Sequence, residues 1–325
     1  AISETYPGSN TYSCTYSAPN YGSAVAVPHT SCPVNSQPSF GLCVCNSSFQ
    51  ERGNACYRAD TPFPVKNLGA SGGCHIGNPV NSSTGNKYQL HLEYAGPSST
   101  YLNLTRHYNS QTNRAWSIGT NWRLLGTIET LSSASVNAIR PDNKVIYFGL
   151  QNSQWVTDDD VQLKLTKLTD GSGNTTGWQV VSEEGEIEYY NAAGSFLSRA
   201  NRAGLGYTRA TVGSDTVLTD SVGRTLVLHT GTSFYETLTD PSGAVTAYGY
   251  DANNNFVSVT YPDGSIRRYH YENTTYKNAL TGITDERGVR YATYGYDANG
   301  KATLTEHAGG ANRHTLNFGT NTTTF

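Results

Sequence analysis

Apolar and polar residues alternate along most of the chain after residue 73. Residues 88–94 (YQLHLEY) carry apolar side chains at every second position, and residues 161–165 (VQLKL) repeat the pattern. A period of two is typical of half-buried β-strands. Residues 1–73 lack this pattern and are rich in Pro, Ser, Asn and Gly. We therefore expect an all-β chain with three parts: an N-terminal module over 1–73, a β-rich opening segment over 74–180 and a repeat sheet over 181–325.

Glycines recur in the second half of the chain at intervals of 19 to 24 residues: Gly185, Gly204, Gly223, Gly243, Gly264 and Gly288. Aspartates precede the last three of them, at Asp240, Asp263 and Asp285. An Asp side chain can accept hydrogen bonds from amides two or three residues later, and Gly readily takes the positive φ that starts the next strand. Each glycine is thus expected in a tight turn.

A Y-x-Y motif follows each of the last three turns, at Tyr248 and Tyr250, Tyr269 and Tyr271, and Tyr294 and Tyr296. Two tyrosines at this spacing share one face of a strand. Each repeat reads as two short strands and two turns, and such hairpins stack into an extended, curved or spiralling antiparallel sheet. The rings are expected to form a ladder of cross-strand aromatic pairs. A platform for stacking sugars is the alternative.

Two tracts resemble a known family. The runs DERGVRYATYGYDANG at 285–300 and EHAGG at 306–310 resemble the YD repeats of bacterial RHS proteins, which animal teneurins share. Upstream, GNPVNSSTGNK at 77–87 and LTRHYNS at 104–110, followed by Gly119 and Trp122, resemble the segment that opens the RHS region of secreted proteobacterial members. The resemblance covers residues 74–318.

The resemblance implies a β-sheet that spirals into a hollow shell, which in bacterial members encloses a toxic C-terminal domain. The family's C-terminal border sequence and a cargo domain do not occur before Phe325. We therefore expect the N-terminal part of a longer RHS protein or a shortened relative, with a structural, non-enzymatic role in the shell of a secreted polymorphic toxin. Its partner is then the remainder of that protein.

A second hypothesis is a self-assembling extracellular filament or adhesin subunit. A short stack of hairpins leaves two sheet edges, and such edges pair with identical subunits. A cell-surface glycan is a further candidate partner, through glycan binding or hydrolysis. The tail at 315–325 alternates at Leu316 and Phe318 and contains neither Lys nor Pro. We expect it to form a strand at a sheet edge or to continue into a neighbouring chain.

The cysteines all precede residue 75: Cys14, Cys32, Cys43, Cys45, Cys56 and Cys74. An even number in a polar segment predicts a disulfide framework of undetermined connectivity. Cys43 and Cys45 are not expected to bond to each other, because side chains two residues apart on a strand have poor disulfide geometry. Zinc is the alternative, with His75 beside Cys74, although paired C-x2-C spacing is absent. The chain has no Met and starts at Ala1, as expected after signal cleavage, so we predict a secreted protein.

Charge and hydropathy exclude two classes of partner. The formal net charge is −3, and the absence of a basic stripe argues against nucleic acid. No run approaches the roughly 18 apolar residues that a membrane-spanning helix needs.

Candidate chemistry is sparse. The cluster at 183–188 (EEGEIE) permits a carboxylate pair as in glycan hydrolases, but alternation of Glu184, Glu186 and Glu188 predicts an outward solvent face. The histidines show no ligand or nucleophile spacing. Residues 158–160 (DDD) and 170–174 (DGSGN) supply oxygen ligands for calcium, or are ordinary turns. We expect no catalytic residue, no metal and no cofactor.

Overall fold

The structure is a computed structural model that describes residues 36–39, 42–45, 49–52, 55–58, 68–69, 75–158, 160–319 and 323–324. Strands and turns make up almost all of these residues, and their only helical segment is the 3-10 turn η1 (Ala308–Gly310). The expected all-β fold is therefore confirmed. The predicted disulfide framework and the zinc alternative concern cysteine side chains that lie outside the described residues. Among the described residues, no helix is long and apolar enough to span a membrane.

A single antiparallel sheet of 15 strands forms most of the fold, and each strand pairs with the strands before and after it in the sequence. The sheet begins at Lys164, so residue 181, the expected start of the repeats, lies inside it. Its strands are β16 (Lys164–Thr169), β17 (Thr175–Val181), β18 (Ile187–Asn191), β19 (Phe196–Ala200), β20 (Gly206–Val212), β21 (Asp215–Asp220), β22 (Thr225–Thr230), β23 (Tyr235–Thr239), β24 (Val245–Tyr250), β25 (Phe256–Thr260), β26 (Ile266–His270), β27 (Gly282–Thr284), β28 (Arg290–Tyr296), β29 (Ala302–His307) and β30 (His314–Thr315).

Smaller sheets come mainly from the opening segment. One joins β11 (Trp122–Arg123), β8 (Asn103–Asn109) and β7 (Tyr88–Ala95), and another joins β12 (Thr127–Ser132), β13 (Ser135–Ile139), β14 (Val145–Gln151) and β15 (Gln154–Val156). The two-stranded pairs are β1 (Ser36–Ser39) with β2 (Leu42–Cys45), β3 (Phe49–Arg52) with β4 (Ala55–Arg58), β5 (His75–Ile76) with β6 (Val80–Asn81), β9 (Ala115–Trp116) with β10 (Gly119–Thr120), and β31 (Asn317–Phe318) with β32 (Thr323–Thr324).

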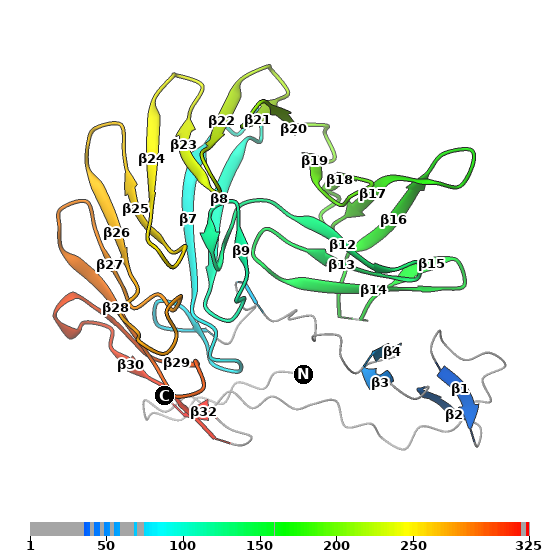
Figure 1. Ribbon diagram of the computed structural model, residues 1–325, viewed down its shortest axis with the longest axis horizontal. Helices are drawn as coiled ribbons and strands as arrows, with labels where there is room; N and C mark the ends of the chain where they lie inside the picture. Colours follow the sequence, from blue (N-terminus) through cyan, green and yellow to red (C-terminus); the bar gives the residue numbers. More distant parts are fainter. Residues whose placement is uncertain are drawn as a thin grey trace.

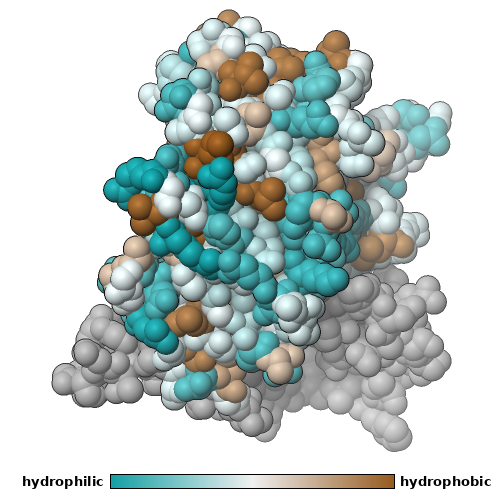
Figure 2. Space-filling model, turned by 60° about the vertical axis from the view of Figure 1, so that its left-hand side comes forward, coloured by the Kyte–Doolittle hydropathy of each residue, from teal (hydrophilic) through white to brown (hydrophobic). Residues whose placement is uncertain are grey.

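The large sheet curves around the opening segment (Figure 1). Its strands follow an arc from β16 to β30, and β7, β8 and β12–β14 lie on the inner side of that arc. One hydrophobic core joins the two parts, with Trp122 of the opening segment against Phe256 of β25 at a ring separation of 5.8 Å. On the side of the molecule that lies at the left of Figure 1, a hydrophilic band separates small hydrophobic groups (Figure 2).

The repeat turns have the predicted positive-φ glycines, and an Asp side chain caps the turn at Asp240. All six repeat glycines have positive φ, for example +86° at Gly243 and +83° at Gly264. Asp240 Oδ1 accepts hydrogen bonds from the amides of Ser242 and Ala244, two and four residues later. The amide of Gly243, three residues after Asp240, donates to the Asp240 backbone carbonyl instead. The second bond of the Asp240 side chain is therefore made with the amide four residues later, not three.

The tyrosine ladder is organised differently from the prediction. The Y-x-Y strands β24, β26 and β28 are not neighbours, because β25 and β27 lie between them. Tyr248 therefore lies opposite Val259, and Tyr269 lies opposite Ile283. No ring pair joins two Y-x-Y motifs within the described part of the chain; instead, Phe256 contacts Tyr248 and Tyr269 at ring separations of 5.3 and 5.5 Å. The expected cross-strand aromatic pairs thus form between these tyrosines and Phe256 of the intervening strand.

The C-terminal tail folds back on the opening segment. Its strand β30 is the last of the large sheet, and β31 pairs with β32 in a sheet of its own. Leu316 is 1% exposed and forms a small second core with Val80 and Ala302. The alternation at Leu316 and Phe318 thus reflects packing against the start of the opening segment.

Candidate functional site: a polar seam between the opening hairpin and the repeats

Strand β7 presents its polar face to the repeats and its apolar face away from them. Leu90 and Leu92 are 50% and 51% exposed, whereas the intervening Gln89, His91 and Glu93 contact residues of the large sheet. The alternation predicted the strand correctly, but Leu90 and Leu92 are exposed where it suggested burial, whereas Tyr88 of the same set is buried. We call this contact, formed by Gln89, His91, Glu93 and Arg106 with the repeat side chains, the polar seam.

A buried ion pair lies at the centre of the polar seam. Arg106 Nε donates to Glu93 Oε1 at 2.7 Å, and the two side chains are 0% and 2% exposed. Burial alone would raise the pKa of the Glu93 carboxyl, but the charge of Arg106 and hydrogen bonds from Tyr248 and Arg106 lower it overall. The guanidinium carbon also lies 3.8 Å from the ring centroid of Phe256, so an aromatic face covers part of the cation.

The first tyrosine of each Y-x-Y motif contacts the polar seam. The Tyr248 hydroxyl donates to Glu93 Oε2 at 2.7 Å, and the Tyr294 hydroxyl donates to Gln89 Oε1 at 3.3 Å. Between them, Arg106 Nη2 donates to the Tyr269 hydroxyl at 3.0 Å. Three successive repeats thus each form a hydrogen bond with the β7–β8 hairpin.

The second tyrosine of each motif forms a hydrogen bond with a backbone carbonyl earlier in the chain. The hydroxyls of Tyr250, Tyr271 and Tyr296 donate to the carbonyls of Tyr235, Phe256 and Leu280, at 2.6, 3.1 and 2.7 Å. Each acceptor lies 15 or 16 residues before its tyrosine. The two positions of Y-x-Y therefore have different partners, and neither leaves a ring free as a sugar platform.

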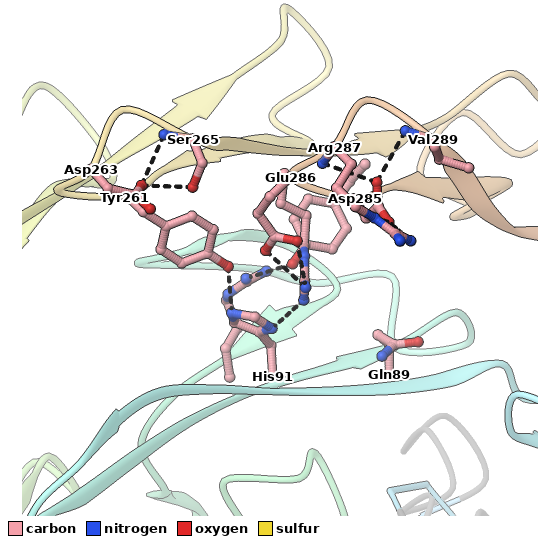
Figure 3. Close-up of polar contacts among 12 residues, drawn as sticks. Gln89, His91, Tyr261, Asp263, Ser265, Asp285, Glu286, Arg287 and Val289 are labelled. Atoms are coloured by element: carbon pink, nitrogen blue, oxygen red, sulfur yellow. Dashed lines mark hydrogen bonds and ion pairs between the residues drawn. The ribbon is translucent and has the colours of Figure 1, made fainter.

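His91 joins β7 to the turns beside β26 and β28 (Figure 3). Arg267 Nη1 lies 3.0 Å from His91 Nδ1, and because arginine only donates, Nδ1 accepts. His91 Nε2 lies 3.1 Å from the Tyr261 hydroxyl, and Arg267 also pairs with Glu286 at 2.8 Å. Burial, together with the charge of Arg106, lowers the His91 pKa to about 4 despite the opposing charge of Glu93.

Only part of the acidic cluster at 183–188 faces solvent: Glu184 is exposed as predicted, whereas Glu186 is partly buried and Glu188 is buried. Glu188 is 3% exposed and receives two hydrogen bonds from Arg140, at 2.5 and 2.8 Å. Glu186 pairs with Arg199 at 2.5 Å and also accepts from the Tyr101 hydroxyl. The prediction of a solvated face was therefore wrong for Glu186 and Glu188, whose cationic partners Arg199 and Arg140 lie on β19 and directly after β13.

The remaining candidate residues form structural contacts. Asp170 Oδ1 accepts from the amides of Ser172 and Asn174, which closes a turn. Among the described residues, no group of three His, Cys, Asp or Glu side chains is arranged to hold a metal ion. The sequence analysis missed Glu93 and Arg106, although Arg106 lies inside the family-like run at 104–110. The available signal was that polar residues, Gln89, His91 and Glu93, occupy every second position of the predicted strand at 88–94.

Two family models match parts of the chain. A family model described as a domain of unknown function, DUF6531, matches residues 77–148, and the model of the RHS repeat matches residues 236–271. No curated protein matches the chain. Among solved structures, that of TcdB2-TccC3 without its hypervariable C-terminal region is 13% identical, with a TM-score of 0.26, and the match covers 74% of this chain and 15% of that chain.

A second structure, TcdB2-TccC3-TEV, is also 13% identical, with a TM-score of 0.27 and the same two coverages. This chain therefore spans 15% of the length of each of those two chains. The RHS-repeat match runs from β23 to the residue after β26 and includes two of the three Y-x-Y motifs and the turns at Gly243 and Gly264. The chain therefore carries an RHS repeat, and its resemblance to RHS/YD-repeat proteins is confirmed.

Proposed function

We propose that this chain forms part of the shell of a secreted RHS polymorphic toxin and acts as a structural scaffold. The observation that carries the proposal is the 15-stranded sheet that curves around its own opening segment. An antiparallel sheet of this kind extends by adding hairpins, and each added hairpin packs against the one before it. The polar seam supports the same role, because it joins the β7–β8 hairpin to three repeats at once.

The charge states in the structure favour a structural role over a catalytic one. A general acid or base needs a pKa close to the working pH. The pKa values of Glu93 and Glu188 are instead lowered overall, since ion pairing with Arg106 and Arg140 outweighs burial. Both carboxylates therefore stay charged near neutral pH and serve as fixed hydrogen-bond acceptors.

Secretion rests on the six cysteines, all before residue 75. Disulfides persist in oxidising compartments and take the place of a hydrophobic core in small modules. Thiol titration of the unfolded native protein, without reductant, should find essentially no free thiol. Four or more free thiols would contradict secretion as an oxidised protein.

The alternative is self-assembly of identical subunits. The end strands β16 and β30 each pair with one neighbour in the large sheet, and a strand edge readily accepts another chain. Intact mass and electron microscopy of the protein isolated from its native source distinguish the two. A longer polypeptide in closed, hollow particles supports the toxin shell, filaments of the short chain support self-assembly, and a monomeric chain ending at Phe325 contradicts both.

A further inference from the structure

One buried arginine lacks the counter-ion that its neighbours possess. Arg106, Arg140 and Arg199 each pair with a glutamate, at 2.7, 2.5 and 2.5 Å. Arg123 of β11 is only 3% exposed, yet its one hydrogen bond in the described structure runs from Nε to the Leu125 carbonyl, at 2.6 Å. Its Nη1 atom has no partner among the described residues.

This arrangement is electrostatically incomplete. A buried cation is costly unless an anion and hydrogen bonds compensate for its lost hydration. Glu129 is the carboxylate whose charge acts on Arg123, but it is held by Arg114 at 2.5 Å. Burial therefore lowers the pKa of Arg123 to about 9, whereas the charge of Glu93 outweighs burial and raises the pKa of Arg106.

Arg123 forms one wall of a cavity of about 170 Å³ between the inner strands and the large sheet. Arg209 of β20 lies on another wall, and none of the lining residues is acidic. The Trp116 ring stacks on Arg123, with the guanidinium carbon 3.8 Å from its centroid, and the Trp116 Nε1 has no partner among the described residues. The cavity thus combines two cations and an unused N–H donor with no negative charge.

We propose that this cavity binds a carboxylate group on a short aliphatic stem, held by Arg123 and Arg209. The planar guanidinium matches a planar carboxylate with two parallel hydrogen bonds. Ile118, Leu124 and Phe196 supply apolar walls for the stem. An apolar cavity of about 150 Å³ accommodates a group as large as benzene, so an acidic peptide side chain and a small organic acid both fit.

Trp116 provides the readout, because it lies against Arg123. The full-length protein is titrated at constant ionic strength with acetate, with succinate and with a blocked Gly-Glu-Gly peptide, and its tryptophan fluorescence is recorded. The matched controls are the Gly-Gln-Gly peptide, phosphate and chloride. We expect a saturable change with carboxylates alone; it should persist in Trp155→Phe and disappear in Trp116→Phe. Saturation by acetate indicates a free organic acid, and saturation by the Glu peptide alone indicates an acidic polypeptide segment.

Arg123→Met should weaken carboxylate binding at least about tenfold, because a charge-assisted hydrogen bond is worth about 1.5–3 kcal/mol. Arg313→Met, whose parent side chain is 58% exposed and pairs with Glu306 away from the cavity, should bind with unchanged affinity. If Arg123→Met fails to fold, Arg209→Met tests the same cavity from the opposite wall. The proposal is overturned if wild type gives no saturable response, if the arginine variants respond like wild type, or if phosphate binds more tightly than any carboxylate.

Discussion

The Tyr248 hydroxyl donates a hydrogen bond to the Glu93 carboxylate at 2.7 Å, across 155 residues of sequence. Glu93 belongs to the second strand pair of the opening segment, and Tyr248 is the first tyrosine of a repeat. Because the carboxylate is buried, it depends on this hydroxyl and on Arg106 for the bonds that water would otherwise supply. The opening segment and the repeats are therefore expected to unfold together.

Removing the charge of Glu93 should destabilise the protein strongly. Glu93→Gln leaves Arg106 buried without its anion, and breaking such a pair costs about 3–5 kcal/mol. Glu306→Gln is the control, since Glu306 and its partner Arg313 are 20% and 58% exposed and a pair at the surface contributes at most about 1 kcal/mol. Urea unfolding at pH 7 measures both. Equal losses in the two variants would show that the Glu93 pair is not buried.

Glu186→Gln is expected to lower stability, contrary to the interpretation of this cluster as a solvated face. Glu186 accepts hydrogen bonds from Arg199 and Tyr101, so a neutral amide weakens a charge-assisted bond worth about 1.5–3 kcal/mol. Glu183→Gln changes an exposed residue of the same turn and serves as the comparison. The measurement is the shift of the thermal midpoint, and indistinguishable midpoints for wild type and Glu186→Gln would restore the solvent-face interpretation.

Gly264→Val should cost about 1–3 kcal/mol through backbone strain alone. Gly264 has φ of +83°, and an added Cβ would meet no atom within 4 Å. A β-branched residue is strained at positive φ, whereas Asn tolerates it; Asn254 already has φ of +63°. Gly264→Asn should therefore unfold at a denaturant concentration close to that of wild type. A valine variant as stable as the asparagine variant would argue against the positive-φ turn.

Acid should destabilise the fold through His91 and His107. Burial lowers both pKa values from 6.5 to about 4, so the unfolded chain binds protons that the folded chain excludes. Stability should fall as the pH drops through 6.5, and the loss should be complete below about 4. Each unit of pKa difference corresponds to about 1.4 kcal/mol. His91→Gln should reduce the slope of stability against pH in this window; an unchanged slope would mean that His91 is not held neutral.

The sequence predicted what local chemistry determines. Gly264 lies in a turn because its neighbours and its missing side chain require one, and residues 88–94 lie on a strand because their polarity alternates. Periodicity does not reveal which face of a strand finds partners. Leu90 is exposed and Glu93 is buried, because a tyrosine hydroxyl and Arg106 are available only after distant segments meet. The same limit explains Glu188, whose partner Arg140 lies on the connection after β13.

The most direct test of the polar seam is a double-mutant cycle between Glu93→Gln and Tyr248→Phe, measured by urea unfolding at pH 7. Tyr248→Phe removes the donor of the 2.7 Å hydrogen bond, and Glu93→Gln removes the charge of its acceptor; the cycle isolates the coupling between the two. We predict a coupling free energy of at least about 1 kcal/mol, because the bond is buried and its acceptor is charged. If the losses of unfolding free energy are additive, with a coupling near zero, the β7–β8 hairpin is not held to the repeats through this contact, and the account is contradicted.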